Sequence, residues 1–563
     1  MVIMGHNLWL GLLAVGLLHA SGRAEEKHLS LRPDSSWVLL GSRTDWTASA
    51  LDTISAPKGL DRTEESLAFL PANQVSNGRI HIKFRMTDWP HYIQAKLIFR
   101  SEDSRQFYMV VAFSMATDMS FTKEEGLMGL ALLRGNASGH RQLLQYIPHL
   151  PWKPGYWYEL RVDLDDALIR VSLYSELEKR FKPLMRVRDG AYSSGSIGIG
   201  ASGPVEFKDL FVVSSAAKHS RGNWQNITRR PYRLAWNDVS VRGSMPKLAR
   251  RKDGALLMAV SELFYRAGPP PQVFVFESKN NGNTWKRISS VPVGYAGLPL
   301  SRGETVYLFD SYVKGDGDSI LRISQEDIAA HKPYEFVPHA RISSDGGKTW
   351  GKPEPLKITE TLIFPTKRQS LNMFVPPRIL ADGRWLLPIF TVAREPFPMT
   401  VESLLLRSSD GGDTWQLGPI DPNHEDASEM DVVQLEPSHL LAVMRTNFNT
   451  GFHGEAHSHD MGRTWSPVKL GSIPGWSSGP RLLKTKNGIL LCMHRLIGTM
   501  ISHSADLGKT WTTYQIDHPI EVMGDLLELG DGRVLAVYSG GGWGGIPRLQ
   551  HLTVTEDGIR PAP

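Results

Sequence analysis

Two kinds of side chain with chemical potential recur at corresponding places in the second half of this sequence. Carboxylates act as general acids, general bases or nucleophiles, and a tyrosine becomes a nucleophile when a nearby base takes its proton. The candidates for these catalytic roles are Glu262, Glu429, Asp431, Asp525 and Tyr538. Arginine binds a ligand carboxylate through two parallel hydrogen bonds, and tyrosine and histidine add further polar contacts. The candidates for substrate binding are Arg242, Arg394, Arg445, Arg495, Tyr312 and His494.

The elements that must position these residues contain an internal repeat. Five segments follow the pattern S-x-D/N-x-G-x-T-W, and their tryptophans lie 65, 65, 50 and 46 residues apart. These five boxes are Ser278–Trp285, Ser343–Trp350, Ser408–Trp415, Ser458–Trp465 and Ser504–Trp511. Aspartate or asparagine accepts backbone hydrogen bonds in a turn, glycine supplies a positive φ, and tryptophan contributes a large apolar area. The pattern predicts hairpin turns whose tryptophans fill the gaps between neighbouring sheets, so we assign none of these residues to catalysis.

Short apolar hairpins alternate with the boxes. The six hairpins are Leu248–Val260, Leu298–Phe309, Ile379–Phe390, Val432–Val443, Leu482–Met493 and Leu526–Val537. Each hairpin together with a box hairpin makes a four-stranded sheet, and six such sheets closed in a ring make a six-bladed β-propeller. The sixth hairpin is followed by no box, so we expect the segment near Trp236 to supply its outer strand.

This ring predicts where the candidate residues meet. The innermost strand of each blade runs away from one face, turns, and returns as the second strand. Residues just before the first strand and just after the second therefore surround one face, and the boxes lie on the other. Converging charged and aromatic side chains on one face are typical of a binding site.

The boxes on six blades resemble the sialidase (neuraminidase) superfamily from about Asn223 to the C-terminus. The resemblance implies arginines that bind the carboxylate of the substrate sugar, a tyrosine nucleophile activated by a glutamate, and an aspartate acid/base. Glu429 matches the glutamate of the family, and Arg445 and Arg495 match two of its arginines.

Three positions depart from the family pattern. Ser244 stands where an arginine is usual, and Arg242 or Arg266 are the candidates to replace it. The stretch 265–272 contains no aspartate acid/base, and Met523 occupies the place of the tyrosine nucleophile. The carboxylates listed above are therefore candidates for a different acid and base, and Tyr538 or Tyr312 for a relocated nucleophile.

The first half of the chain contains no box. Alternating strands and the glycine-rich segment Gly195–Ala201 favour an antiparallel β-sandwich. This region looks like a concanavalin-A-like jelly roll of the kind found beside glycoside hydrolases. It either binds a glycan or packs as a structural domain on the propeller.

The N-terminus and the composition restrict the compartment and the partners. The apolar run Leu8–Leu18 is too short for a bilayer span and predicts a signal peptide over residues 1–24. With a single cysteine, a bacterial periplasm or secretion into the medium is favoured over an animal secretory route.

A formal charge of +5 over 563 residues gives no argument for nucleic acid as a partner, and no motif indicates a metal or cofactor. No later segment is apolar enough for a membrane span, and the sequence leaves the oligomeric state open.

The sequence therefore predicts an all-β chain with a signal peptide, a sandwich over 27–215 and a six-bladed propeller over 223–563. Three functions remain open. The favoured one is a secreted exo-glycosidase of the sialidase superfamily with altered catalytic groups. A lyase for uronic-acid polysaccharides and a non-catalytic glycan-binding protein are the alternatives, and all three predict an acidic or complex glycan as the partner.

Overall fold

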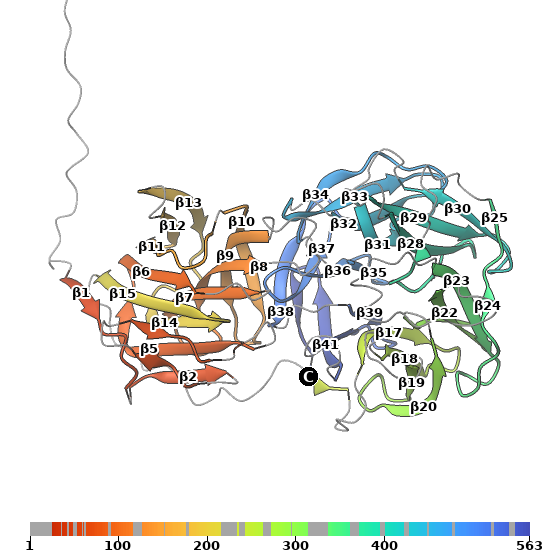
Figure 1. The fold of residues 1–563 in the computed structure, drawn as a ribbon, viewed down its shortest axis with the longest axis horizontal. Helices are drawn as coiled ribbons and strands as arrows, with labels where there is room; N and C mark the ends of the chain where they lie inside the picture. The colour runs from red at the N-terminus through yellow and green to blue at the C-terminus, as the bar shows by residue number, and fades with distance from the viewer. Residues whose placement is uncertain are drawn as a thin grey trace, which may run out of the picture.

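The computed structural model describes most of the chain, and every element in the described residues is a β-strand (Figure 1). The all-β class is therefore confirmed for this part of the protein. The described residues are 25–34, 36–41, 44–48, 53–58, 60, 64–87, 92–115, 127–150, 152–175, 179–214, 233–235, 243–262, 272–293, 296–313, 336–360, 371–393, 400–420, 427–446, 450–475, 479–518, 523–539 and 546–562. They contain no helix with the length and apolarity that crossing a membrane requires.

The N-terminal half forms two antiparallel sheets, which we name sheet A and sheet B. Sheet A has the order β13 (Arg180–Arg188), β12 (Leu168–Ser175), β11 (Tyr158–Asp165), β6 (Gly78–Met86), β15 (Val205–Ser214), β4 (Ile54–Ser55) and β3 (Thr47–Ala48), with β1 (Glu25–Leu29) also paired to β15. The N-terminal part of sheet B has the order β2 (Val38–Gly41), β5 (Ser66–Val75), β14 (Gly195–Ser202), β7 (Ile93–Ser101), β8 (Tyr108–Met115), β9 (Leu127–Gly135) and β10 (Arg141–Pro148).

Alternation of buried and less buried residues in sheet A packs one of its faces against sheet B. In β6, Ile80, Ile82 and Phe84 are buried, whereas the residues between them reach the other side of the sheet. Leu97 and Phe99 of β7 join them in one core. Strands with a period of two bury one face only, so the opposite face of sheet A stays open to solvent.

The C-terminal half forms a propeller-like set of sheets around a common centre (Figure 1). Two have four strands in chain order: β17 (Ser244–Arg250), β18 (Leu256–Ser261), β19 (Gln272–Ser278) and β20 (Lys286–Pro292); then β21 (Leu298–Arg302), β22 (Thr305–Val313), β23 (Phe336–Ser343) and β24 (Glu354–Pro355). The next contains β25 (Ile358–Glu360), β26 (Leu371–Asn372), β27 (Arg378–Ile379), β28 (Trp385–Ala393), β29 (Thr400–Ser408) and β30 (Trp415–Pro419). Another has β31 (Ala427–Gln434), β32 (Leu440–Thr446), β33 (Phe452–Ser458) and β34 (Lys469–Pro474).

Two further sets of strands complete the described part. The strands β35 (Arg481–Lys484), β36 (Leu490–Arg495), β37 (Thr499–Ser504) and β38 (Thr512–Asp517) are antiparallel in chain order, and β38 also pairs with β10, which makes them part of sheet B. The last sheet contains β39 (Asp525–Glu528), β40 (Val534–Tyr538), β41 (Arg548–Thr555), β42 (Gly558–Pro561) and β16 (Arg233–Leu234).

The predicted hairpins are confirmed by the pairing of these strands, from β17 with β18 to β39 with β40. The expected strand from the segment near Trp236 is also present, because β16 pairs with the outer edge of β41. Trp236 itself lies outside the described residues.

The boxes form the predicted turns, as Ser408–Trp415 shows. The Asp410 carboxylate accepts hydrogen bonds from the Thr414 hydroxyl at 2.6 Å, the Thr414 amide at 3.0 Å and the Ser408 hydroxyl at 2.7 Å. The Gly412 amide donates to the Ser408 hydroxyl at 2.8 Å. These hydrogen bonds, with that from the Thr414 hydroxyl the strongest, hold the pKa of Asp410 well below its ordinary value. One carboxylate therefore organises the whole turn.

The box tryptophans lie between neighbouring sheets, as predicted. Trp415 is fully buried and packs edge-on against Phe309 of β22 at a ring distance of 6.1 Å. Trp350 joins the apolar cluster between β18 and β22, and Trp511 joins the one between β32 and β36. Each of these side chains therefore joins its own sheet to the preceding one.

Contacts between turns place the boxes on one face of the ring. Arg251, in the turn after β17, donates to the carbonyl of Gly346 in a box at 3.1 Å. Arg302, in the turn after β21, reaches the carbonyl of Gly411 in the next box at 3.4 Å. The boxes therefore lie at the end where the inner hairpins turn, and the first strands begin at the opposite end.

The two halves of the chain share a buried contact. Leu496, Ile497 and Met500 of the β36–β37 connection pack into the apolar cluster formed by the outer side of sheet B. Beside it, the Glu65 carboxylate receives Arg141 at 2.7 Å and also the ammonium group of Lys96. Sheet B therefore lies between sheet A and the propeller-like half.

Replacing Asp410 with alanine should lower the midpoint of thermal unfolding by about 2 °C or more, since the turn loses three hydrogen bonds to one charged acceptor. Asp413→Ala is the matched control, because Asp413 is an exposed aspartate of the same turn. Differential scanning calorimetry measures both variants. Equal midpoints for the two variants would contradict the structural role of the box aspartate.

Candidate functional site

The candidate site lies at the ends of the inner strands, on the face opposite to the boxes. Glu429 and Asp431 lie on β31, Arg445 ends β32, and Asp525 begins β39. The connections that follow β18, β22, β28, β32 and β40 at this end fall outside the described residues. The geometry of the site is therefore that of the strand ends themselves.

Asp431 is fully buried, and two arginines from different sheets share its carboxylate. Arg378 of β27 donates to it at 2.8 Å, and Arg481 of β35 donates to it at 2.9 Å. The Leu482 amide of β35 is a third donor, at 2.7 Å. Burial alone would raise the pKa of Asp431, but the two arginines outweigh it and hold the pKa below its ordinary value.

Asp525 makes the equivalent contacts one sheet further along. It is fully buried, forms an ion pair with Arg481, and accepts the Leu248 amide of β17 at 2.8 Å. Arg481 thus bridges the two aspartates, and its pKa is raised because their charges outweigh the effect of burial. A continuous line of ion pairs therefore joins four inner strands, β27, β31, β35 and β39, through Arg378, Asp431, Arg481 and Asp525. These contacts account for both aspartates without a ligand.

Glu429 differs from the two aspartates in having a free oxygen. Its side chain is 6% exposed, and the Arg445 guanidinium approaches one carboxylate oxygen at 3.4 Å. Among the described residues, the second oxygen has no hydrogen-bond partner, and neither has Nε of Arg445. Buried polar atoms without partners are uncommon, so these two atoms are open to a ligand, a water molecule or a residue outside the described part of the chain.

Two buried histidines lie beside this pair. Nδ1 of His453 contacts the Met444 carbonyl at 3.3 Å, and Nε2 of His494 contacts the Ser502 hydroxyl at 2.8 Å. Their rings are 5.4 Å apart and nearly perpendicular. In the described part of the chain, His453 Nε2 and His494 Nδ1 have no partner.

Electrostatics keeps both rings neutral near pH 7. Burial, together with the charges of Arg445 and Arg495, lowers the pKa of His453 to about 4. Burial and the neighbouring His453 hold the pKa of His494 well below its ordinary value. A neutral imidazole with a free nitrogen can accept a hydrogen bond or a proton, although the lowered pKa makes His453 a weak base.

The segment between β34 and β35 passes very close to these side chains. A Cβ atom on Gly475 would come within 2.6 Å of Nε2 of His453, and the φ of Gly475 is 147°. A Cβ atom on Gly479 would lie 3.0 Å from the Cβ of Glu429. Glycine is therefore required at Gly475, and the backbone forms one wall of the candidate site.

Other predicted site residues are not brought to this group. Tyr538 is fully buried between β40 and the β35–β38 strands, where it donates to Asp517 at 2.9 Å. Burial and the charge of Asp517 raise the pKa of Tyr538 well above its ordinary value. Glu262 follows β18 and accepts the Gln272 amide at 3.2 Å. The protein encloses Tyr538 completely, so its hydroxyl contacts Asp517 rather than the group around Glu429.

Three predicted binding residues cannot be placed. Arg242 and Arg394 lie outside the described residues, and so does the side chain of Tyr312. Arg495, by contrast, ends β36 next to His494, and its charge acts on His453.

Three charged residues at this end escaped the sequence prediction. Arg378 is the first residue of β27, and Arg481 is the first residue of β35. Lys247 is buried in β17 and donates to the Gly524 carbonyl at 2.8 Å. Burial, although opposed by the charge of Asp525, lowers the pKa of Lys247 to about 8. In each case the sequence offered a signal, because a charged residue stands directly before apolar residues of an inner strand.

The side opposite Glu429 is apolar and carries backbone strain. Met523, which stands where the family has its tyrosine, packs against a cluster that includes Met245 and Phe374. Met245 has a φ of 54°, in the left-handed region that branched or long side chains rarely adopt. The position of Met523 therefore offers no nucleophile.

No group of three or more histidine, cysteine or acidic side chains in the described residues is arranged to hold a metal ion.

Comparison with known proteins finds similarities in part of this region. Residues 298–496 match the family described as a BNR repeat-like domain. The chain is 24% identical to a sialidase of Paraclostridium sordellii over 249 residues. The matched region covers 41% of this chain and 58% of that protein. It is 32% identical to a sialidase of Clostridium perfringens over 147 residues. That matched region covers 24% of this chain and 37% of that protein. The chain thus spans 58% or less of the length of these two relatives.

Among solved structures, Trypanosoma rangeli sialidase in complex with the inhibitor DANA matches with a TM-score of 0.39 and 16% identity. The match covers 57% of this chain and 54% of that one.

Replacing Arg481 with leucine should cost about 3–5 kcal/mol of unfolding free energy, because Asp431 and Asp525 stay buried and lose their common cation. Arg533→Leu is the control: Arg533 forms an ion pair with Asp531 that is partly exposed, at 29% and 38%. That loss should stay below about 1 kcal/mol. Urea unfolding at pH 7 measures the unfolding free energy of both variants. Similar losses of unfolding free energy would contradict the stabilising role of the ion pairs that Arg481 makes with Asp431 and Asp525.

Proposed function

We propose that this protein is a carbohydrate-active enzyme of the sialidase superfamily that removes a terminal acidic sugar from a glycan. One observation carries the proposal. Four buried polar atoms without described partners, on Glu429, Arg445, His453 and His494, gather where neighbouring strands end on the face away from the boxes. The BNR repeat-like match over residues 298–496 and the similarity to two sialidases support the same reaction class.

The roles follow from the chemistry of each group. Arg445 and Arg495 lie at corresponding ends of β32 and β36 and would bind the carboxylate of the sugar. Glu429, with one free oxygen, is our candidate for general acid or base. Asp431 and Asp525 would support the site through Arg481 rather than touch the substrate. Met523 excludes the family's tyrosine nucleophile at that position, so the catalytic groups would be non-standard.

A lyase for uronic-acid polysaccharides is the second candidate. Elimination needs a cation on the carboxylate and a base for the α-proton. The neutral ring of His453, with a free nitrogen near Arg445 and Arg495, favours this candidate. A protein that only binds glycans is the third reading.

We also infer the remaining organisation of the chain. The strands β35–β38 follow the inner-to-outer order of the neighbouring sheets, so we propose that they are one blade of a six-bladed propeller over residues 223–563. Residues 27–215 would be a jelly-roll sandwich. Residues 1–24, outside the described part, would be a signal peptide that directs the protein to the periplasm or the medium.

Mass spectrometry of products separates the three functions. The protein is incubated with 3′-sialyllactose and, separately, with polygalacturonate. We expect free sialic acid, with product masses that sum to the substrate plus one water. Unsaturated uronate products would instead support the lyase, and an unchanged glycan that is still bound would overturn both enzymatic readings.

The same assay tests the arginine pair. Arg445→Ala should lower kcat/KM by about 10–100-fold, the range expected for losing charge-assisted hydrogen bonds to a carboxylate. Arg463→Ala is the matched control, because Arg463 is an exposed arginine in the box turn of the same sheet. Equal activity of the two variants would contradict the assignment of this face.

A further inference from the structure

A row of aligned side chains crosses the outer face of sheet A. Strand register places Lys208 of β15 opposite Lys83 of β6, and Lys83 opposite Glu159 of β11. The row continues from Glu159 to Tyr174 of β12 and from Tyr174 to Phe181 of β13. Five neighbouring strands thus present one polar and aromatic line to the solvent, away from the core between sheets A and B.

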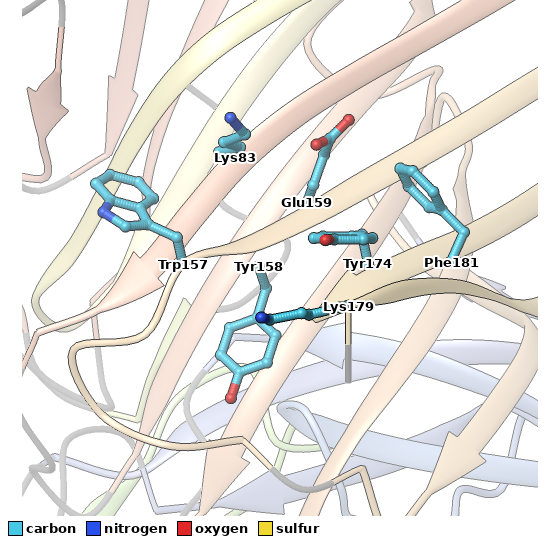
Figure 2. Close-up of a pocket in the computed structure, with 7 residues that line it drawn as sticks. All are labelled: Lys83, Trp157, Tyr158, Glu159, Tyr174, Lys179 and Phe181. Atoms are coloured by element: carbon cyan, nitrogen blue, oxygen red, sulfur yellow. The ribbon is translucent and has the colours of Figure 1, made fainter. Parts of the chain in front are cut away.

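Aromatic rings stand at both ends of this row (Figure 2). At one end, the ring of Trp157 is contacted by the guanidinium of Arg85 at 4.7 Å and the ammonium of Lys208 at 4.1 Å. At the other end, Phe181 lies 5.1 Å from Tyr174, ring to ring, and is one of the exposed large apolar residues of the described chain. Such cation–π and ring–ring contacts fix the orientation of the rings.

Between the rings the face is hollowed. The hollow has a volume of about 530 Å³ and is lined by Lys83, Trp157, Tyr158, Glu159, Tyr174, Lys179 and Phe181. This volume falls within the range of about 300–1,000 Å³ that small-molecule sites occupy. Figure 2 shows Glu159 and Tyr174 lying between Trp157 and Phe181, so polar groups face the middle of the hollow and flat rings face its ends.

The charges beside the hollow favour an acidic ligand. Lys83 pairs with Asp209 at 3.0 Å and Arg85 pairs with Glu206, so the cations that favour an acidic ligand are Lys179, exposed at the rim, and Lys208 on the ring of Trp157. A sugar ring offers an apolar C–H face for an aromatic ring and hydroxyl groups for Glu159 and the lysines. A carboxylate on that sugar would complement Lys179 and Lys208.

We propose that this hollow on sheet A binds a carboxylated oligosaccharide, at a site separate from the inner-strand ends of the propeller-like half. Sheet B and its two apolar clusters lie between the hollow and that half. A second site on the same chain raises the effective concentration of a polymeric glycan at the first one.

Binding of fluorescently labelled oligomers to the full chain tests the proposal. The probes are oligogalacturonate, as the uronate source, and 3′-sialyllactose, as the sialic-acid source, with lactose as the neutral comparison. We expect one of the two acidic probes to bind and lactose to bind at least about tenfold more weakly. Trp157→Ala and Phe181→Ala should each weaken that binding by about tenfold or more.

Tyr156→Ala is the matched control, since Tyr156 is 41% exposed next to Trp157 but does not line the hollow. It should bind like the unmodified protein, and near-ultraviolet circular dichroism should show that all three variants are folded. The proposal is overturned if neither acidic probe binds, or if Trp157→Ala and Phe181→Ala both bind as tightly as Tyr156→Ala. It is equally overturned if single-stranded DNA competes as well as the glycan, because charge alone would then explain the binding.

Discussion

A ring of sheets has to satisfy the polar groups of its innermost strands where they meet around the centre. In this protein two buried aspartates do so. Asp431 accepts the Leu482 amide of the next set of strands, and Asp525 accepts the Leu248 amide of β17, the first inner strand of the C-terminal half. Arg481 lies between both carboxylates and balances their charge. Burying carboxylates is costly unless they are paired and fully hydrogen-bonded, so this arrangement constrains where each inner strand begins.

This constraint separates the charged residues that hold the fold from those that remain for chemistry. Asp431 and Glu429 are two residues apart on β31, yet among the described residues only Asp431 has hydrogen-bond partners for both carboxylate oxygens. Glu429 and Arg445 keep unpartnered atoms within the described residues, and so does His453 beside them. The ion pairs of Asp431 and Asp525 therefore belong to the fold, and we propose that Glu429, Arg445 and His453 are the groups that meet a ligand.

Local patterns predicted the repeats well. The boxes and hairpins close through hydrogen bonds within a few residues, such as Ser408 to Asp410, so their sequence alone determines their form. The site was predicted less completely, because strand starts depend on distant partners. Arg378 and Arg481 were missed for that reason, and Tyr538 points into the packing between β40 and the β35–β38 strands rather than toward the strand ends. The pairing of β10 with β38 joins residues more than 370 positions apart, and no local pattern encodes it.

The central claim is that an acidic sugar binds between Arg445 and Arg495 with Glu429 beside it. A crystal structure of the protein soaked with N-acetylneuraminate, and another soaked with galacturonate, tests this directly. The account predicts a sugar carboxylate within hydrogen-bond distance of both guanidinium groups in at least one of the two. It is contradicted if neither sugar occupies this position while Glu429 and both arginines are well ordered and accessible in the crystal.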